Sequence, residues 1–280
     1  MSDPYVIDSS DPLGERVADW YAETNRARAT TVEALSPTAW SLLTPTLPKS
    51  FANNAILVRD DPGAEQLIAW ADAALDGYDH RYVAAMCDLR DDTRTALTAA
   101  GYRLTGLVTM ARELPGAPLP SPPGVVAEAA DDDTLARLHS VLWRTEWLPG
   151  IGDDEVAQLV SRRTRPVEGV TTYAWVVRDA ELDDPVSGDL AATLELHVHG
   201  WAAEIDGVAT RAPARGRRYA DALMATCVAK AYDEGCTHAI LSALTDDWPL
   251  HWYARRGFRV VGVAWEALRR LDGLAFASSS

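Results

Sequence analysis

Four arginines crowd into one short stretch in the second half of the chain. They are Arg211, Arg215, Arg217 and Arg218, and no acidic residue stands between them. The chain as a whole carries a formal net charge of −15, so this local excess of positive charge stands out. Arginine binds phosphate groups through paired, charged N–H donors. The stretch therefore predicts a site for a phosphorylated ligand, and the alternative for the arginines alone is a solvated basic turn.

The flanking residues place this basic turn between a strand and a helix. Residues 204–210 read as the end of a strand, and Tyr219–Lys230 read as a helix because their apolar residues recur at helical spacing. The first N–H groups of a helix have no partner within the helix, and the helix dipole adds partial positive charge at the same end. A strand that leads through a basic loop into a helix is therefore suited to bind an anion.

An earlier segment, from Thr193 to His199, alternates polar and apolar residues, so Glu195 and His197 share one face of a predicted strand. One interpretation is the polar wall of a cleft, with Glu195 or His197 as a base or as a contact for an amine. The other is a half-exposed strand near the end of a sheet. No metal site is predicted, because same-face strand residues without a further ligand seldom hold a metal.

Two tryptophans, Trp143 and Trp147, lie one helical turn apart. Core packing is the more frequent use of tryptophan. The alternative is an aromatic lid over an amine substrate, because a cation is attracted to the face of an indole ring.

Two segments, in this order, resemble the GNAT acetyltransferase superfamily between about Leu190 and Val263. The first is similar to the family's Arg or Gln, two residues, Gly, one residue, then Gly or Ala. The second, Trp252–Phe258, is similar to the family's aromatic residue, Tyr, three residues, Gly and Phe. The resemblance implies acetyl-CoA as co-substrate and an amine as acceptor. The residues of the first segment are Arg215, Gly216, Arg217, Arg218, Tyr219 and Ala220.

The resemblance also implies roles. Backbone N–H groups of the first segment would hold the CoA pyrophosphate, and the strand before it would pair with the pantetheine amides. Tyr253 would protonate the leaving thiolate, a task that suits a phenol. Glu204 would be a catalytic carboxylate, or else an edge carboxylate that faces solvent. Asp246 stands where many relatives carry an Asn that touches the pantetheine arm. The strand residues implied in this pairing are Val208, Ala209 and Thr210.

Arg218 departs from the family pattern, which usually has Gly at this position. Glycine lets the backbone approach a phosphate closely and adopt unusual dihedral angles. The arginine side chain could turn outward or could itself bind a phosphate. Alternatively, the loop is impaired.

A short internal repeat predicts a tandem architecture. Residues 100–107 and 256–263 match in type and spacing. Between them, five of the eleven residues of 114–124 are proline, which is typical of a stiff linker. The predicted domains are therefore 1–113 and 125–272, joined by linker 114–124 and followed by a disordered tail, 273–280. The alternative is one large α/β domain with a loose connection.

The predicted fold class is α/β, with two tandem GNAT-like domains, each a mostly antiparallel twisted sheet flanked by helices. In the first half, Leu97 occupies the position of Tyr253, and the helix that follows Asp60 has no arginine-rich loop before it. We therefore expect the first half to be degenerate, without cofactor loop or acid. Its opening segment, Glu15–Leu35, is expected to form one helix.

The composition excludes several functional classes. The acidic balance argues against non-specific nucleic-acid binding, which needs a basic face. The three cysteines give neither a disulfide framework nor a metal-binding spacing. The polar N-terminus is unlike a signal peptide, and no apolar run is long enough to span a bilayer. We expect a cytoplasmic monomer or homodimer without nucleic-acid or membrane partners.

These features and the resemblance together predict an N-acetyltransferase. It would move the acetyl group of acetyl-CoA to a primary amine by direct attack in a ternary complex. The acceptor, a small molecule or a peptide, stays open, as does a longer acyl donor. The alternative is a non-catalytic acyl-CoA-binding or scaffold protein with two degenerate GNAT-like domains.

Overall fold

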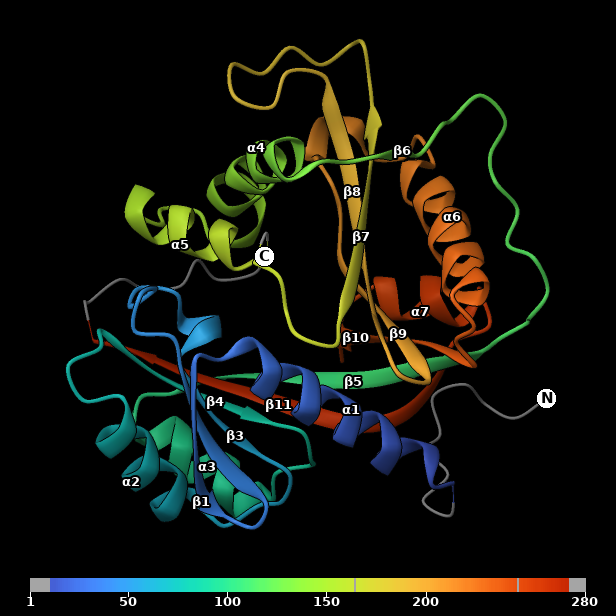
Figure 1. Ribbon diagram of the computed structural model, residues 1–280. Coiled ribbons are helices and arrows are strands. Elements are labelled where there is room, and N and C mark those ends of the chain that lie inside the picture. The colour runs from blue at the N-terminus through green and yellow to red at the C-terminus, as the bar shows by residue number, and fades with distance from the viewer. Residues whose placement is uncertain (1–10, 164, 246, 272–280) are drawn as a thin grey trace. The chain divides into compact units, whose positions relative to one another are not determined.

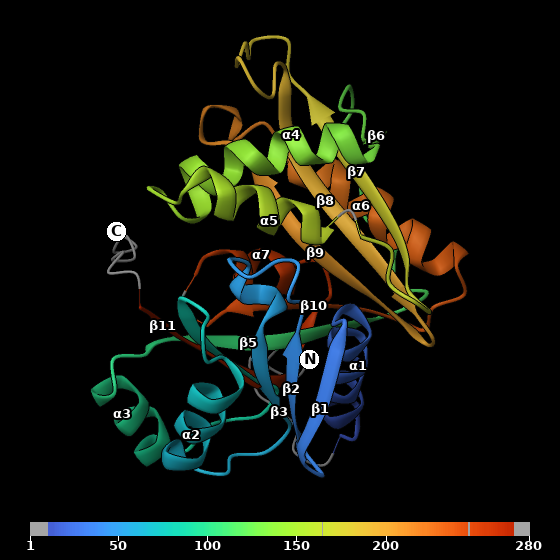
Figure 2. The same cartoon turned by 60° about the vertical axis from the view of Figure 1, so that its left-hand side comes forward.

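The computed structural model describes residues 11–163, 165–245 and 247–271. The chain forms two compact units, which Figures 1 and 2 show with their elements labelled. Of the described residues, unit 1 contains 11–111 and 242–271, and unit 2 contains the rest. No helix in the described part of the chain is long and apolar enough to cross a membrane.

Unit 1 is a sheet with the strand order β1-β2-β3-β4-β11-β5 and helices on both faces. Neighbouring strands are antiparallel except β3 and β4, which α2 connects in a parallel crossover. The elements are α1 (Leu13–Arg28), β1 (Thr31–Ser36), β2 (Ala39–Leu43), β3 (Ala55–Val58), α2 (Ala64–Ala74), β4 (His80–Ala85), α3 (Asp91–Ala99), β5 (Arg103–Glu113), α7 (Pro249–Ala254) and β11 (Arg259–Arg270).

The core of unit 1 follows from the alternation along β3. Ile56 and Val58 pack with Leu67 of α2 and Leu97 of α3. Leu57, between them, packs with Ala22 of α1 on the opposite face. Because successive strand residues point to opposite faces, a short run of apolar residues supplies both layers of the core.

The predicted single helix over Glu15–Leu35 is wrong in its second part. The helix α1 ends at Arg28, Ala29 is extended, and β1 begins at Thr31. Thr31 and Val32 are β-branched, and such side chains favour strands over helices. Pairing of β1 with β2 decides the conformation of this segment.

The last strand of the chain, β11, lies between β4 and β5 and is antiparallel to both. The predicted boundaries place β11 in the second domain, whereas it packs in the compact unit of the first half. The domain boundaries at 113 and 125 stay predictions, and residues 114–124 contain no helix or strand. The two copies of the internal repeat extend onto β5 and β11, which pair with each other. Each copy faces residues outside the other copy, because residues 103–107 lie opposite 264–268 and residues 259–263 lie opposite 108–111.

Two equivalent glycines of the repeat lie opposite larger residues in the β5–β11 ladder. Gly106 lies opposite Trp265, and Gly262 lies opposite Thr109. A Cβ atom on Gly106 would be 3.2 Å from the indole of Trp265, and one on Gly262 would be 2.8 Å from Oγ1 of Thr109. Each glycine therefore makes room for the side chain that faces it.

Unit 2 is a sheet with the strand order β10-β9-β8-β7-β6. Again one pair is parallel, β9 with β10, and a helix, α6, connects the two strands. The elements are β6 (Glu128–Ala129), α4 (Asp132–Leu142), a π-helical turn (Trp143–Trp147), α5 (Asp153–Arg163), β7 (Thr171–Arg178), β8 (Leu190–His199), β9 (Ala202–Thr210), α6 (Tyr219–Asp233) and β10 (His238–Leu244).

Both faces of the unit 2 sheet are covered. In Figure 1, α4 and α5 lie on one side of β7 and β8, and α6 lies on the other. All residues of β8 from Leu190 to His197 are buried. A half-exposed strand was the alternative interpretation of this segment, and it is wrong because helices cover both faces.

Candidate functional site

The predicted anion-binding loop connects β9 to α6. The strand ends at Thr210, a single 3-10 turn spans Ala212–Ala214, and α6 begins at Tyr219. Gly216 has a φ of +81°, which glycine adopts without steric strain. The first N–H groups of α6 follow this loop directly, where helical N–H groups lack acceptors within the helix. The predicted order of strand, loop and helix is therefore present.

Arg218 immediately precedes α6, with φ 64° and ψ 21°. Among the described residues, it is the only one other than glycine with a positive φ. This left-handed conformation costs a residue with a side chain about 1–2 kcal/mol. The Arg218 side chain is 57% exposed, and its Nε donates to Oδ2 of Asp221 at 3.0 Å. The loop thus has a backbone typical of glycine at this position, with the arginine side chain exposed.

Every arginine of the loop is paired with a carboxylate. Except for Asp221, these carboxylates come from distant segments, which the local sequence could not reveal. A ligand phosphate would compete with them for the guanidinium groups. The pairs are Arg211 with Asp184 at 3.0 Å, Arg215 with Glu146 at 2.5 Å, Arg217 with Asp179 at 2.7 Å and with Glu181 at 2.8 Å, and Arg218 with Asp221 at 3.0 Å.

Glu146 contacts this loop in two places. Its Oε1 accepts from the backbone N–H of Ala212 at 2.9 Å, and its Oε2 accepts from Arg215. Glu146 belongs to the π-helical turn, and such turns are frequent at functional sites. The carboxylate therefore acts as an internal anion at the start of the basic loop.

A β-bulge in β9 lies just before the loop. Thr193 of β8 faces Ala209, whereas Glu195 faces Asp206, so β9 has one extra residue at this point. Gly207 has a φ of +62°, and a Cβ atom on it would be 2.7 Å from Oε1 of Glu195. Only glycine fits here. The bulge interrupts the β8–β9 ladder just before Ala209 and Thr210, which still lie opposite Thr193 and Ala192. Residues 208–210 are those expected to pair with the pantetheine arm.

Glu195 lies in a buried group of ionisable side chains on the α4 and α5 side of the sheet. Nη1 of Arg163 lies 2.8 Å from Oε1 of Glu195 and 2.8 Å from Oδ2 of Asp206. Burial raises the pKa of Glu195, although Arg163 opposes the shift. Burial alone would lower the pKa of Arg163, but the charges of the neighbouring carboxylates raise it above its usual value. The arginine therefore stays charged.

Two histidines border this group. His139 of α4 is fully buried, and its Nε2 lies 3.3 Å from Oε1 of Glu195. Burial, together with the charge of Arg163, lowers the pKa of His139 to about 3. The Nε2 atom of His197 lies 3.9 Å from Glu195 and 4.0 Å from Asp206. His139 is therefore neutral at physiological pH, and His197 lies within ion-pair distance of two carboxylates.

Glu204 lies opposite His197 in the β8–β9 ladder and next to Ile240 of β10. It is 8% exposed, so the alternative of an edge carboxylate that faces solvent is wrong. Its charge contributes to the raised pKa of Arg163. Glu204 therefore adds a third carboxylate near the guanidinium.

Trp143 and Trp147, the two tryptophans considered as an aromatic lid, are the first and last residues of the π-helical turn. Their rings meet edge to face, with centroids 5.0 Å apart, and the ring of Trp147 lies 5.2 Å from that of His139. Trp143 and Trp147 are both half-buried. The structure thus brings Trp147 to the edge of the ionisable group around Glu195.

Tyr253 lies in unit 1, on α7, whereas the basic loop lies in unit 2. The tyrosine is buried, and its ring contacts those of Trp252 and Phe258 with centroid separations of 5.1 and 6.1 Å. Asp246, the predicted contact of the pantetheine arm, lies outside the described residues. Within unit 1, Val108, Val260 and residues on and before α7 line a pocket of about 510 Å³.

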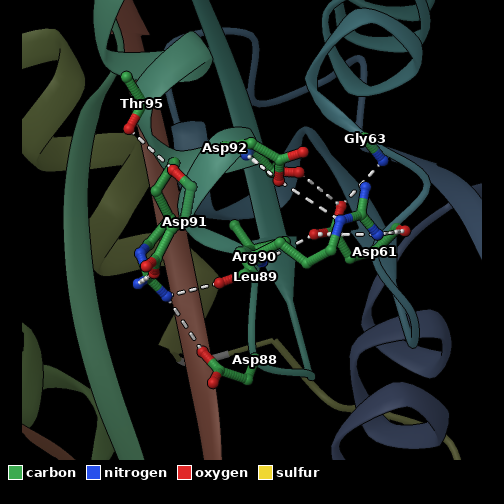
Figure 3. Close-up of polar contacts among 10 residues, drawn as sticks. Asp61, Gly63, Asp88, Leu89, Arg90, Asp91, Asp92 and Thr95 are labelled. Carbon is green, nitrogen blue, oxygen red and sulfur yellow. Dashed lines mark hydrogen bonds and ion pairs between the residues drawn. The ribbon is translucent and has the colours of Figure 1, made fainter.

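The corresponding loop of unit 1 contains its own anion. Asp61, between β3 and α2, accepts from the backbone N–H of Gly63 at 2.8 Å and of Arg90 at 2.8 Å, and from Oγ1 of Thr93 at 3.1 Å. Figure 3 shows Arg90 and Gly63 directed at this carboxylate. Leu97, in the position of Tyr253, is fully buried in the core. The loop before α2 in unit 1 thus contains a carboxylate, whereas the equivalent loop before α6 in unit 2 is basic.

Comparisons with known proteins agree with the strand, loop and helix of unit 2. Residues 138–258 match the model of the acetyltransferase (GNAT) family. This segment is a GNAT acetyltransferase domain. Members of this family transfer acyl groups, and they use acetyl-CoA. No curated protein sequence matches the chain.

Solved structures with the same fold extend over both halves. A functionally unknown protein from Staphylococcus epidermidis has a TM-score of 0.67 at 12% identity, covering 86% of this chain and 94% of its own. A GCN5-related N-acetyltransferase from Kribbella flavida has a TM-score of 0.60 at 18% identity, and the match covers 92% of this chain and 95% of its own. A tandem GNAT protein from the clavulanic acid biosynthesis pathway has a TM-score of 0.50 at 13% identity, and the match covers 96% of this chain and 98% of its own. The predicted GNAT fold class, with tandem GNAT-like halves, is confirmed.

Sequence reasoning missed several residues of this site. Arg163, His139 and Glu146 come from helical segments that carry no motif. Asp206 was missed as well, although the glycine after it was a usable signal, because an isolated glycine within a strand often marks a bulge. Partners for the loop arginines could only be found in three dimensions.

Proposed function

We propose that this protein is an N-acetyltransferase that moves the acetyl group of acetyl-CoA to a primary amine by direct attack in a ternary complex. The observation that carries the proposal is the β9–loop–α6 segment of the GNAT domain, in which even Arg218 has the backbone conformation typical of glycine. A helix N-terminus behind a loop of this kind favours a diphosphate.

Residues 208–220 would bind the co-substrate. The N–H groups from Arg215 to Ala220 would hold the pyrophosphate. The backbone of Val208–Thr210, which lies beyond the part of β9 that pairs with β10, would pair with pantetheine. Acetyl-CoA supplies the activated thioester. The residues around it orient the acyl group toward the acceptor amine.

Two proton transfers accompany the reaction. The ammonium of the acceptor must lose a proton before it attacks, and the thiolate must gain one as it leaves. We assign the second transfer to Tyr253 and the first to Glu204, acting directly or through water. Glu204 is supported by its place on β9, the strand that enters the loop, and by its burial beside other carboxylates.

The second candidate is a non-catalytic acyl-CoA-binding or scaffold protein. It is favoured by the carboxylates paired with all four loop arginines, which weaken their availability for phosphate. The two candidates differ in one measurement. Release of free CoA thiol from acetyl-CoA across a panel of amines is expected for the enzyme. Saturable acetyl-CoA binding without thiol release for any amine would favour the scaffold.

We further propose that the protein acts in the cytoplasm as a monomer or homodimer, on a small-molecule or peptide amine. The net charge of −15 supports a cationic acceptor and disfavours a nucleic-acid partner. Sedimentation of the purified chain at micromolar concentration would distinguish monomer from dimer.

A further inference from the structure

Six ionisable side chains of unit 2 meet between the sheet and the helices α4 and α5. They come from two helices and two neighbouring strands, and five of the six are largely buried. They are His139 of α4, Arg163 of α5, Glu195 and His197 of β8, and Glu204 and Asp206 of β9. We call this set the acidic cluster.

The acidic cluster contains more negative than positive groups. Arg163 is the arginine that contacts it, and a single atom, Nη1, serves both Glu195 and Asp206 at 2.8 Å. The charge of the neighbouring Arg162 also acts on Glu195. Glu204 adds a third carboxylate that acts on the same guanidinium. His139 is neutral, because burial opposes its protonation. Buried carboxylates are costly unless cations or N–H donors compensate them, so the cluster has room for a further cation.

Buried polar atoms without partners point to the same conclusion. Oε2 of Glu195 and both ring nitrogens of His139 have no hydrogen-bond partner among the described residues, although neither side chain is exposed. The His139 ring faces the cluster, with Nε2 3.3 Å from Glu195. Orphaned buried polar atoms are rare in native proteins and call for a missing partner.

One residue opens the cluster toward solvent. Asp206 has a side chain that is 33% exposed, while those of Glu195 and His197 are nearly inaccessible. It precedes Gly207 at the bulge, and the strand continues from there into the residues proposed to hold the pantetheine arm. A ligand that reaches Asp206 would therefore lie next to the residues proposed to hold the pantetheine arm.

We infer that the acidic cluster is the anchor site for a cationic group of the acceptor, and that Asp206 contacts it. This inference rests on the proposed function and narrows its substrate class. An ammonium held by Asp206 keeps its proton, because nearby opposite charge favours the charged form. It cannot also be the nucleophile, so the acceptor carries two nitrogen groups: one cationic group that is bound and one primary amine that is acetylated. Glu204 serves the other nitrogen, the attacking amine.

Binding of three probes of equal chain length to the full chain, without acetyl-CoA, tests this assignment. They are n-butylamine, 1-butanol and butanoate, measured by isothermal titration calorimetry. We expect n-butylamine, whose ammonium can occupy the anchor, to bind at least about tenfold more tightly than the neutral 1-butanol, the difference that one good ion pair supplies, and butanoate to bind most weakly. Equal affinities, or no binding of n-butylamine, would overturn the assignment.

Variants of Asp206 test whether this carboxylate causes the binding preference. Asp206→Asn should remove the preference for n-butylamine over 1-butanol, and Asp206→Glu should retain most of it. The matched control is Asp189→Asn, which also removes a carboxylate paired with an arginine of unit 2, Arg178, and should leave the preference intact. An unchanged preference in a folded Asp206→Asn protein would refute the role of Asp206. Because acetyl-CoA is absent, a failure of the proposed acetyl transfer would not affect this result.

Discussion

Arg218 and Asp221 form an ion pair across the first turn of α6, with Nε of the arginine 3.0 Å from Oδ2 of the aspartate. The same arginine has a left-handed backbone, the only such residue besides glycine in the described part of the chain. The two facts together explain how an arginine replaces the usual glycine of this loop. Its side chain is bonded to the helix it precedes, and its backbone retains the geometry of the loop.

Arg218→Gly should stabilise the protein. Glycine removes the left-handed strain of about 1–2 kcal/mol, while the loss of an exposed ion pair costs only about 0–1 kcal/mol. The free energy of unfolding, measured by urea denaturation, should therefore rise. Arg218→Ala is the control, because it loses the ion pair and retains the strain, and it should be less stable than Arg218→Gly. A free energy of unfolding below that of the wild type in Arg218→Gly would show that the ion pair outweighs the strain.

Glu146→Gln should strengthen acetyl-CoA binding. The carboxylate of Glu146 is paired with Arg215, so its removal releases a guanidinium for the phosphates. We expect the dissociation constant to fall about two- to fivefold, the effect of one partly exposed ion pair. Glu181→Gln is the control, since Arg217 would keep its second partner, Asp179. Weaker binding by Glu146→Gln would mean that Glu146 orders the loop instead of competing with the phosphates of acetyl-CoA for Arg215.

Gly14→Ala tests the place of β11 in unit 1. A Cβ atom on Gly14, in the first turn of α1, would collide with the backbone oxygen of Val261 on β11. Backbone atoms cannot move aside as a flexible side chain can, so we expect destabilisation of about 1–3 kcal/mol. Gly152→Ala, where no atom lies within 4 Å of the new Cβ, should lose less than about 1 kcal/mol. Equal stabilities would contradict the packing of α1 on β11.

Tyr253→Phe should slow acetyl transfer while acetyl-CoA affinity stays nearly unchanged. A general acid contributes typically about 10²–10⁴-fold to a rate, and the phenylalanine ring keeps the contacts with Trp252 and Phe258. The control is Tyr173→Phe, which loses a hydroxyl bonded to Glu234 in unit 2. A turnover equal to that of the wild type would remove Tyr253 from the mechanism.

Local features of the site could be predicted from the sequence, and long-range ones could not. The loop around Arg215 was recognisable because strand, loop and helix are contiguous, and the alternation that groups Glu195 with His197 is likewise a local signal. Glu146 lies 69 residues before Arg215, so nothing in the sequence links the two.

The same limit applies to the fold. The repeat was visible in the sequence, but the pairing of β5 with β11 was not, because strand neighbours are set by tertiary packing. The helix predicted through Thr31 failed for a related reason. Pairing with β2 determines the conformation of that segment, and periodicity within one segment carries no information about a partner strand.

The central claim is that the β9–loop–α6 segment binds acetyl-CoA, and titration calorimetry of the full chain with acetyl-CoA tests it most directly. We predict one site per chain with a micromolar dissociation constant, because unit 2 has the basic loop and the equivalent loop of unit 1 holds the carboxylate of Asp61. No heat of binding at high micromolar acetyl-CoA would contradict the account.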